Sequence, residues 1–340
     1  MDKIIAFKHE MAAHCENGVT SNLLKFNTIN LSEPMIFGIG SGLFFSYMPF
    51  LKLNGIPVTS FRPLPGVIFK RVTKRLHIDV KVQTFNSESR AMIELDKLIE
   101  LGIPVGMVVG VYDLTYFPPA YRFRFNAHNI IAVGKKEETY YISDPIMEEI
   151  EPLNHADLVK NRFAGGTWKP KGKMYYIKNV PKELHIESAI VKGIKKTCKD
   201  MLTIPIPYFG VKGISTLANQ LEKWPQKLGD KKAKLYLGQV VRMQEEIGTG
   251  GAGFRFLYAA FLQESSKLLN NSNLNDVSAR MTAVGDRWRD FGVLAGRIFK
   301  QREKSEYAYK EAADILRDIR GKEEIIYKDL QTILKKAAIQ

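Results

Sequence analysis

The sequence changes character near residue 180, and no other feature constrains the fold as strongly. Before this point, short β-rich runs are punctuated by Gly and Pro, whereas after the break Asn179-Val-Pro-Lys182 long amphipathic segments follow one another. A chain of 340 residues is also long enough for two ordinary domains. We therefore predict a mixed α and β domain over residues 1–180 and an all-helical domain over residues 181–340.

Hydrophobic periodicity places the elements within each half. Two helices are expected in the first half, over 19–26 and over about 87–101. The β-rich runs lie at 103–112, 130–133, 139–142 and 173–177. The helices expected in the second half lie at about 184–200, 208–224, 232–247, 252–270, 275–301, 304–320 and 322–338.

The formal net charge of +14 favours anionic partners such as an acidic carrier protein, a phosphorylated cofactor or an anionic lipid surface. Nucleic acid is not expected as the main partner, because the Lys and Arg residues are dispersed and no nucleic-acid-binding motif accompanies them. There is no apolar run of membrane-spanning length, and Met1-Asp2-Lys3 does not open a secretory signal. We expect a cytoplasmic protein without a transmembrane segment.

The two cysteines, Cys15 and Cys198, are too few for a disulfide framework or a cysteine zinc cage. Cys198 lies on a basic helical segment without a nearby His, which indicates a structural thiol. Cys15 has a different setting, because a polar loop leads from it into a segment whose apolar residues fall at helical spacing. A helix N-terminus favours the thiolate, the form of cysteine that acts as a nucleophile.

A general base for Cys15 is expected from a hairpin later in the chain. His128 begins the run 128–134, and after the polar turn 135–138 the returning strand ends at Asp144. If the hairpin is centred near Lys136, His128 lies directly opposite Asp144 on the same face, and the carboxylate can hold the imidazole tautomer. A slip of one residue would break this geometry. Asn129 is an alternative partner for the imidazole, although strand alternation points it to the opposite face.

Several runs of this sequence resemble the N-terminal domain of the butirosin-biosynthesis protein H (BtrH) family, an acyltransferase family with a papain-like fold. The runs are His14–Asn17, Asn22–Leu24, Leu31–Gly42, Ala127–Asn129 and Ser143–Pro145. The later run Ile247–Phe261 looks like the uncharacterised helical domain that often follows it. More distantly, Cys15, His128 and Asp144-Pro145 are similar to the arrangement in the cysteine peptidases that process double-glycine leader peptides.

The resemblance implies a thiol acyltransferase of secondary-metabolite biosynthesis with a Cys15-His128-Asp144 triad. It would take an acyl group from a carrier-protein thioester, hold it on Cys15 and pass it to a small amine. No cofactor and no metal are implied. A peptidase or amidohydrolase, in which water replaces the amine, is the alternative within enzymes, and an inactive binding or regulatory protein of the same fold is the alternative outside them. A homo-oligomer is possible.

One departure from the peptidase pattern concerns the oxyanion hole. Those relatives carry a glutamine a few residues before the cysteine, whereas residues 1–14 contain no Gln. The Cys15 backbone N–H is a candidate donor, with the Asn17 or His9 side chain as the second one. His9 and His14 could also form a metal site with Cys15, which is a weaker interpretation.

Three further residues are candidates for substrate contact. Glu33 could meet the amine, with a cap or salt bridge as the alternative. Gly40 lies in a glycine-rich loop that is expected near the active cleft, where backbone amides could meet a substrate oxygen. Arg255 follows the glycine-rich run 248–253, which would suit a carboxylate or phosphate at a helix N-terminus, with a helix-joining loop as the alternative. We expect the cleft where the two domains meet.

Overall fold

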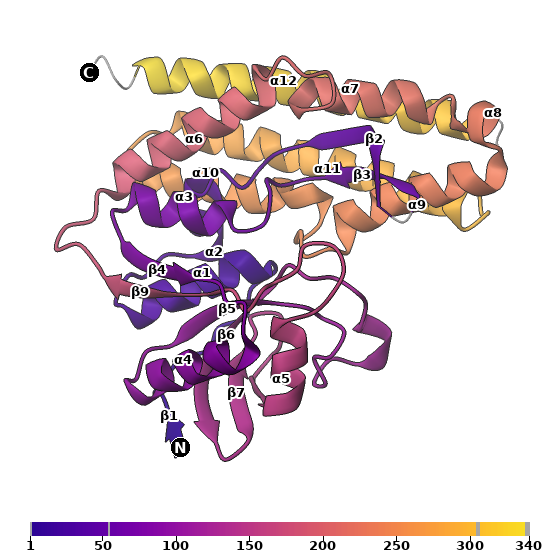
Figure 1. Ribbon diagram of the computed structural model, residues 1–340. Coiled ribbons are helices and arrows are strands. Elements are labelled where there is room, and N and C mark those ends of the chain that lie inside the picture. Colours follow the sequence, from indigo (N-terminus) through magenta and orange to yellow (C-terminus); the bar gives the residue numbers. More distant parts are fainter. Residues whose placement is uncertain (1, 54, 304–306, 337–340) are drawn as a thin grey trace. The chain divides into compact units, whose positions relative to one another are not determined.

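The computed structural model describes residues 2–53, 55–303 and 307–336 (Figure 1). The chain divides into two compact units. The first unit combines Met1–Ile36 with Thr73–Leu184, and the second combines Phe37–Val72 with His185–Gln340.

The first unit is built on an antiparallel sheet in the order β4-β9-β5-β6-β7-β8, with β1 also paired to β6. Its strands are β1 Asp2–Ile4, β4 Asp79–Gln83, β5 Val105–Val109, β6 His128–Lys136, β7 Thr139–Ser143, β8 Ile150–Asn154 and β9 Met174–Asn179. Its helices are α1 Cys15–Phe26, α4 Glu88–Glu100, α5 His155–Arg162 and the start of α2 Glu33–Ile39, with a 3₁₀ turn at Pro119–Tyr121. This architecture confirms the mixed α and β fold expected for the first half.

Helix α4 shows why the helix predicted over 87–101 forms. Ser87 caps it by accepting a hydrogen bond from the Arg90 backbone N–H, which satisfies one of the free donors at the helix start. The apolar residues at helical spacing, Met92, Leu95, Leu98 and Ile99, are all buried. They pack into one core with side chains of β5 and β6, so α4 covers one face of these two strands.

The register of the β6–β7 hairpin differs from the predicted one. Ile131 pairs with Ser143, and continuing this register places Asp144 opposite Ile130. The predicted pairing of His128 with Asp144 is therefore wrong, and His128 pairs with Val109 of β5. The reason is that the chain turns at Glu137 and Glu138 rather than at Lys136, which shifts the pairing of the two strands. A bulge between Ala132 and Gly134 shifts the pairing back toward the predicted register, but not far enough to place Asp144 opposite His128.

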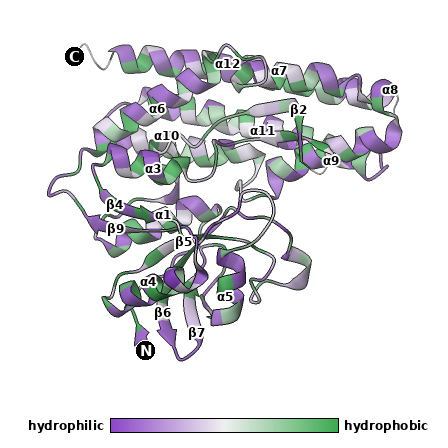
Figure 2. Ribbon diagram, viewed as in Figure 1, coloured by the Kyte–Doolittle hydropathy of each residue, from purple (hydrophilic) through white to green (hydrophobic). Residues whose placement is uncertain are grey.

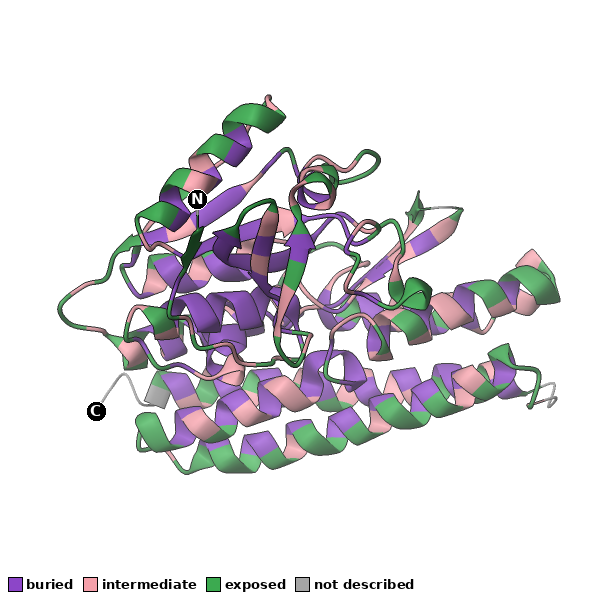
Figure 3. Cartoon of the chain, turned by 90° about the horizontal axis from the view of Figure 1, so that it is seen from below, coloured by how far each residue is buried: buried purple, intermediate pink, exposed green. Residues whose placement is uncertain are grey.

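The second unit combines a two-stranded sheet with a group of helices. Its strands are β2 Ser46–Leu53 and β3 Ile56–Ser60. They are followed by α3 Val67–Arg75, within which the chain returns to the first unit at Thr73. The later helices are α6 Ile186–Leu202, α7 Gly210–Leu221, α8 Trp224–Leu228, α9 Asp230–Glu245, α10 Arg255–Leu268, α11 Asn273–Phe299 and α12 Ala308–Lys336, with a 3₁₀ turn at Ala252–Phe254. Hydrophobic and hydrophilic residues alternate along the long helices, as do buried and exposed ones (Figures 2 and 3).

The C-terminal part is helical, as predicted, but the segment 37–72 joins it and brings the β2–β3 hairpin. The predicted division at residue 180 did not anticipate this. Backbone hydrogen bonds hold the segment to the helices, from the Tyr47 N–H to the Tyr208 carbonyl and from the Gly210 N–H to the Phe45 carbonyl. The Phe45 ring also packs against Trp288. The second unit is therefore not all-helical.

Helix α12 is continuous where two helices, 304–320 and 322–338, were predicted. The first residues of the former and the last of the latter lie outside the described residues. Ion pairs between residues four apart, Lys322 with Asp318 and Arg320 with Glu324, span the expected break at Gly321. Among the described residues, none of the helices combines the length and the apolar composition required to cross a bilayer.

Candidate active site

Cys15 is the first residue of α1. The preceding residue, His14, has extended backbone angles (φ −125°, ψ 125°), so the chain enters the helix sharply at Cys15. Cys15 as a whole residue has an exposed fraction of 9%. At this position the thiol meets the positive end of the helix dipole, which favours the thiolate.

The loop before Cys15 is held by Glu33. Its Oε1 accepts a hydrogen bond from the His14 backbone N–H at 2.8 Å, and its Oε2 accepts one from the Ala13 N–H at 2.9 Å. Burial raises the pKa of Glu33, and these two backbone donors oppose the shift together with the nearby Asn17 amide. Glu33 therefore fixes the backbone of the loop before Cys15, in line with its alternative interpretation as a cap.

Asn17 is fully buried beside this carboxylate. In the part of the chain that the structure describes, its side-chain amide makes no hydrogen bond of ordinary geometry, although it helps to stabilise the Glu33 charge. The structure thus places Asn17 with Glu33, and its predicted contact with an oxyanion stays a prediction.

Helix α1 approaches the segment after β7 very closely. A Cβ atom at Gly18 would lie 2.5 Å from the Cβ of Pro145 and 2.6 Å from the Cβ of Ala12. The Ala12 backbone N–H also donates to the Pro145 carbonyl at 2.7 Å. Because Pro145 follows Asp144 directly, this close packing sets the distance between the helix that starts at Cys15 and the segment that carries Asp144.

The Asp144 carboxylate contacts His128 and is fully buried. The His128 Nε2 lies 2.7 Å from Asp144 Oδ2, so the two side chains meet although they are not opposite each other in the hairpin. The diagonal offset is within reach of these side chains. The Tyr116 hydroxyl donates to the same oxygen at 3.0 Å, and the Ile146 backbone N–H donates to Oδ1 at 3.2 Å.

The charge state of His128 follows from these neighbours. Burial lowers the pKa of His128, but the charges of Asp144 and Cys15 and the hydrogen bonds to both raise it to about 10. Because Nε2 is bonded to Asp144, Nδ1 is the nitrogen left for the sulfur. The arrangement favours an imidazolium paired with the Cys15 thiolate at neutral pH.

The sequence did not predict the contacts that three residues make in this site. Asn129 donates from Nδ2 to Cys15 Sγ at 3.9 Å, and it lies on the face of the sheet opposite the core formed by Met107, Val109 and Ile130, as strand alternation predicts. Tyr175 on β9 donates to Asn129 Oδ1 at 2.7 Å, and Tyr116 contacts Asp144. Neither tyrosine lies in a motif, so periodicity gave no signal for them. The one available signal for Asn129 was its position next to His128.

His9 lies beside the segment that carries Asp144. Its Nε2 is 3.0 Å from the Met147 carbonyl oxygen and its Nδ1 is 2.8 Å from Ser143 Oγ. Since a carbonyl only accepts, Nε2 carries the proton and Nδ1 accepts from the serine hydroxyl. These bonds engage both ring nitrogens, so the structure does not support the predicted role of His9 as an oxyanion donor.

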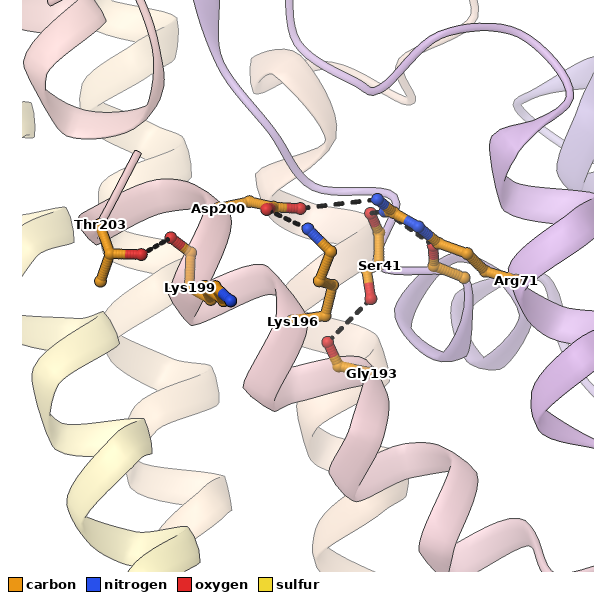
Figure 4. A network of polar contacts seen from close by, with 8 residues as sticks. Ser41, Arg71, Gly193, Lys196, Lys199, Asp200 and Thr203 are labelled. Atoms are coloured by element: carbon orange, nitrogen blue, oxygen red, sulfur yellow. Dashed lines mark hydrogen bonds and ion pairs between the residues drawn. The ribbon is translucent and has the colours of Figure 1, made fainter. Parts of the chain in front are cut away.

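Gly40 belongs to the second unit, where its loop is bound to helices of that unit. The Gly40 and Ser41 carbonyls accept from Arg71 Nη1 at 3.4 and 3.0 Å, and Ser41 Oγ donates to the Gly193 carbonyl at 3.0 Å. Figure 4 shows this network, in which Arg71 also pairs with Asp200 at 3.6 Å. Gly40 and Cys15 belong to different units, and the predicted place of the Gly40 loop near the active cleft stays a prediction.

Arg255 likewise belongs to the second unit and is fully buried. Its Nε and Nη2 donate to the two carboxylate oxygens of Glu323 at 2.9 and 3.1 Å, and its Nη1 donates to the Gly253 carbonyl at 2.8 Å. The guanidinium also lies over the Trp288 ring. The predicted contact with a substrate anion is not supported, because this buried ion pair already engages the side chain.

The second thiol has the properties of a structural residue. Cys198 is fully buried within α6, and burial raises its pKa to about 12. It therefore stays a neutral thiol at physiological pH. Among the described residues, no group of three or more His, Cys, Asp and Glu side chains is arranged to hold a metal ion.

Two family models match the chain. One is "Butirosin biosynthesis protein H, N-terminal" over residues 14–145, and the other is "Domain of unknown function (DUF4872)" over residues 156–330, more than half of the chain. The chain therefore belongs to the DUF4872 family, and its first part matches the BtrH N-terminal model. The BtrH N-terminal match includes Cys15, His128 and Asp144, and the DUF4872 match covers most of the C-terminal helices.

No curated protein sequence matches this chain. Among solved structures, one described as a C39-like peptidase from Bacillus anthracis is similar over 53% of this chain and 100% of its own, with 15% sequence identity and a TM-score of 0.37. The match to the BtrH N-terminal model, together with a cysteine at a helix start that interacts with a histidine on a strand, supports a papain-like cysteine enzyme.

Proposed function

We propose that this protein is a cysteine-dependent acyltransferase, which moves an acyl group from a thioester to an amine through an acyl thioester on Cys15. The observation that carries the proposal is the connected series of Asp144, His128 and Cys15, in which the raised pKa of His128 favours an ion pair with the sulfur. The match to the BtrH N-terminal model supports acyl transfer as the reaction.

The first half of the reaction loads the enzyme. The Cys15 thiolate attacks the carbonyl carbon of the donor thioester, and the carbonyl oxygen becomes an oxyanion. The Cys15 backbone N–H, at the start of α1, is a candidate donor to this oxygen. When the oxyanion collapses, the bond to the donor sulfur breaks, and the His128 imidazolium gives its proton to the leaving thiolate.

The second half of the reaction transfers the acyl group from Cys15 to the amine. His128, now neutral, takes a proton from the amine as its nitrogen attacks the acyl carbon on Cys15. Collapse of this second oxyanion breaks the carbon–sulfur bond, releases the amide and restores the thiolate beside the imidazolium. Asp144 holds the imidazole ring throughout, and Glu33 holds the backbone before Cys15 in place.

The donor is proposed to be an acyl group on an acidic carrier protein, and the acceptor a small amine. A chain of formal net charge +14 attracts an acidic partner. Hydrolysis of a thioester, a peptide or a small amide is the second outcome that the same residues permit, since water can replace the amine.

Intact-mass spectrometry after incubation with a panel of acyl-carrier and acyl-CoA thioesters tests the proposal. We expect a mass increase equal to the acyl group, which is lost in Cys15→Ser and retained in Cys198→Ser. Release of the adduct should be faster with an added amine than with water alone, and the amide should appear as product.

Two results would contradict the proposed acyl transfer to an amine. If no thioester loads the protein and iodoacetamide labels Cys15 no faster than Cys198, the protein is a binding or regulatory member of its family. If the adduct forms but only water removes it across a panel of amines, the protein is a hydrolase.

A further inference from the structure

The Asn129 side chain reaches the Cys15 sulfur from β6. Its Nδ2 lies 3.9 Å from Cys15 Sγ, and both residues are buried. A nitrogen that carries hydrogen stabilises negative charge on an acceptor, and hydrogen bonds to charged groups are stronger than neutral ones. The proposed mechanism has no role so far for this contact.

The direction of the Asn129 amide is fixed by two neighbours. Its Nδ2 also donates to the Ala127 carbonyl at 3.3 Å, and a carbonyl can only accept. On the other side, the Tyr175 hydroxyl donates to Oδ1 at 2.7 Å. If the amide were reversed, its oxygen would face both the Ala127 carbonyl and the sulfur, so the N–H side must point at Cys15.

Tyr175 is well suited to hold this orientation. Burial and the nearby charges of Glu16 and Cys15 raise its pKa well above the ordinary value, so the hydroxyl keeps its proton. Its ring lies over Gly106, which is its partner residue on β5. A Cβ at Gly106 would lie 2.4 Å from the ring, so glycine makes room for the ring at this place.

We infer that Asn129 is a catalytic residue that stabilises the Cys15 thiolate with its side-chain N–H, and that Tyr175 is the positioning residue that orients it. The inference rests on the proposed function only in taking Cys15 as the nucleophile. When the Cys15 proton passes to His128, the resulting negative charge on sulfur has two neighbours that favour it, the imidazolium and this amide.

The test is the rate of Cys15 alkylation by iodoacetamide as a function of pH, followed by intact mass in the full-length protein. In Asn129→Leu we expect the apparent pKa of the Cys15 thiol to rise by about 1–2 pH units, the shift that loss of a hydrogen bond to a charged group produces. Asn129→Asp has nearly the same shape but presents oxygen to the sulfur, so the shift should be larger than in Asn129→Leu.

Tyr175→Phe keeps the ring over Gly106 and removes only the hydroxyl, so we expect a smaller shift in the same direction. Tyr176→Phe, one residue further along the same strand, is the matched control and should leave the profile unchanged. A merely structural role predicts the reverse order for the Asn129 variants, because Leu disturbs the packing more than Asp does.

An unchanged profile in folded Asn129→Leu or Asn129→Asp would overturn the inference, as would a larger effect of Leu than of Asp. If Asn129→Leu does not fold, Asn129→Asp and Tyr175→Phe decide the matter. Alkylation requires no acyl donor, so a failure of every thioester to load Cys15 would reject the proposed function and leave this result standing.

Discussion

Among single residues, Asp144 has hydrogen-bond donors on both carboxylate oxygens. His128 and Tyr116 contact Oδ2, and the Ile146 backbone N–H contacts Oδ1. An amide side chain could retain much of this geometry, because it has a similar shape and still offers an oxygen acceptor. What it cannot retain is the negative charge that keeps the His128 pKa high.

The first prediction concerns Asp144→Asn. Below its pKa of about 10, His128 is protonated and can give its proton to the leaving thiolate, and above this value it is neutral. In the wild type we expect the rate of acylation at Cys15 to fall on the alkaline side near pH 10. In Asp144→Asn, burial still disfavours the imidazolium while the charge that opposed it is gone, so the alkaline fall should move to lower pH.

At neutral pH the acylation rate of Asp144→Asn should drop by about 10²–10⁴-fold, the range for a disturbed general acid and base. Single-turnover acylation followed by mass spectrometry at several pH values measures both effects. Asp96→Asn is the matched control, since Asp96 is bonded to Lys135 and Tyr140 and not to His128. Equal profiles for the two variants would contradict the role given to Asp144.

The residues of the site differ in how far the sequence could predict them. Cys15, His128 and Asp144 could be proposed together because each lies in a run with its own signal: a helix start, a strand start and an Asp-Pro turn. Tyr116 and Tyr175 could not, because they reach the site from a loop and from β9. Which buried hydroxyl meets which polar group is decided by tertiary packing, and hydrophobic periodicity carries no information about it.

At the level of the elements, the β6–β7 hairpin shows a limit of pattern reasoning. The two strands were predicted close to their true positions, but the turn and the bulge were not. Register depends on such local details, because one extra residue in a strand changes every pairing beyond it. His128 and Asp144 still meet, because His128 is the first residue of β6 and Asp144 directly follows β7, where side chains at diagonal positions are within reach of each other.

The second prediction compares two glycines in helices. In α1, a methyl group at Gly18 would overlap Pro145 and Ala12, whereas at Gly321 in α12 no atom lies within 4 Å of an added Cβ. Gly→Ala in an open helix position stabilises by about 0.5–1 kcal/mol, because alanine loses less conformational entropy on folding. Overpacking costs about 1–3 kcal/mol. We therefore expect Gly321→Ala to raise the free energy of unfolding and Gly18→Ala to lower it.

Denaturant unfolding of the two variants measures these changes. Gly18→Ala should also slow iodoacetamide labelling of Cys15, since relief of the overlap moves α1 away from Pro145 and the neighbouring Asp144. Gly321→Ala should label at the wild-type rate. A Gly18→Ala variant that is as stable and as reactive as the wild type would show that the close packing of α1 does not set the geometry of the site.

At the level of the whole molecule, the excess of positive charge predicts a salt-dependent attraction for an acidic protein. A formal net charge of +14 attracts an acidic protein over distances set by the ionic strength. The Debye length is about 10 Å at 0.1 M salt and about 3 Å at 1 M, so salt removes such steering long before it affects a hydrogen-bonded site. A small neutral thioester has no net charge for this field to act on.

The last prediction follows from this difference. Between about 0.05 and 0.5 M salt, we expect the rate of Cys15 acylation by a thioester on an acidic carrier protein to fall on the order of tenfold or more. The rate with the same acyl group on a small neutral thiol should change little, because attack by the thiolate depends on buried contacts. If both donors respond equally to salt, the charge of this protein does not serve to attract its acyl donor, and a small-molecule thioester becomes the better candidate.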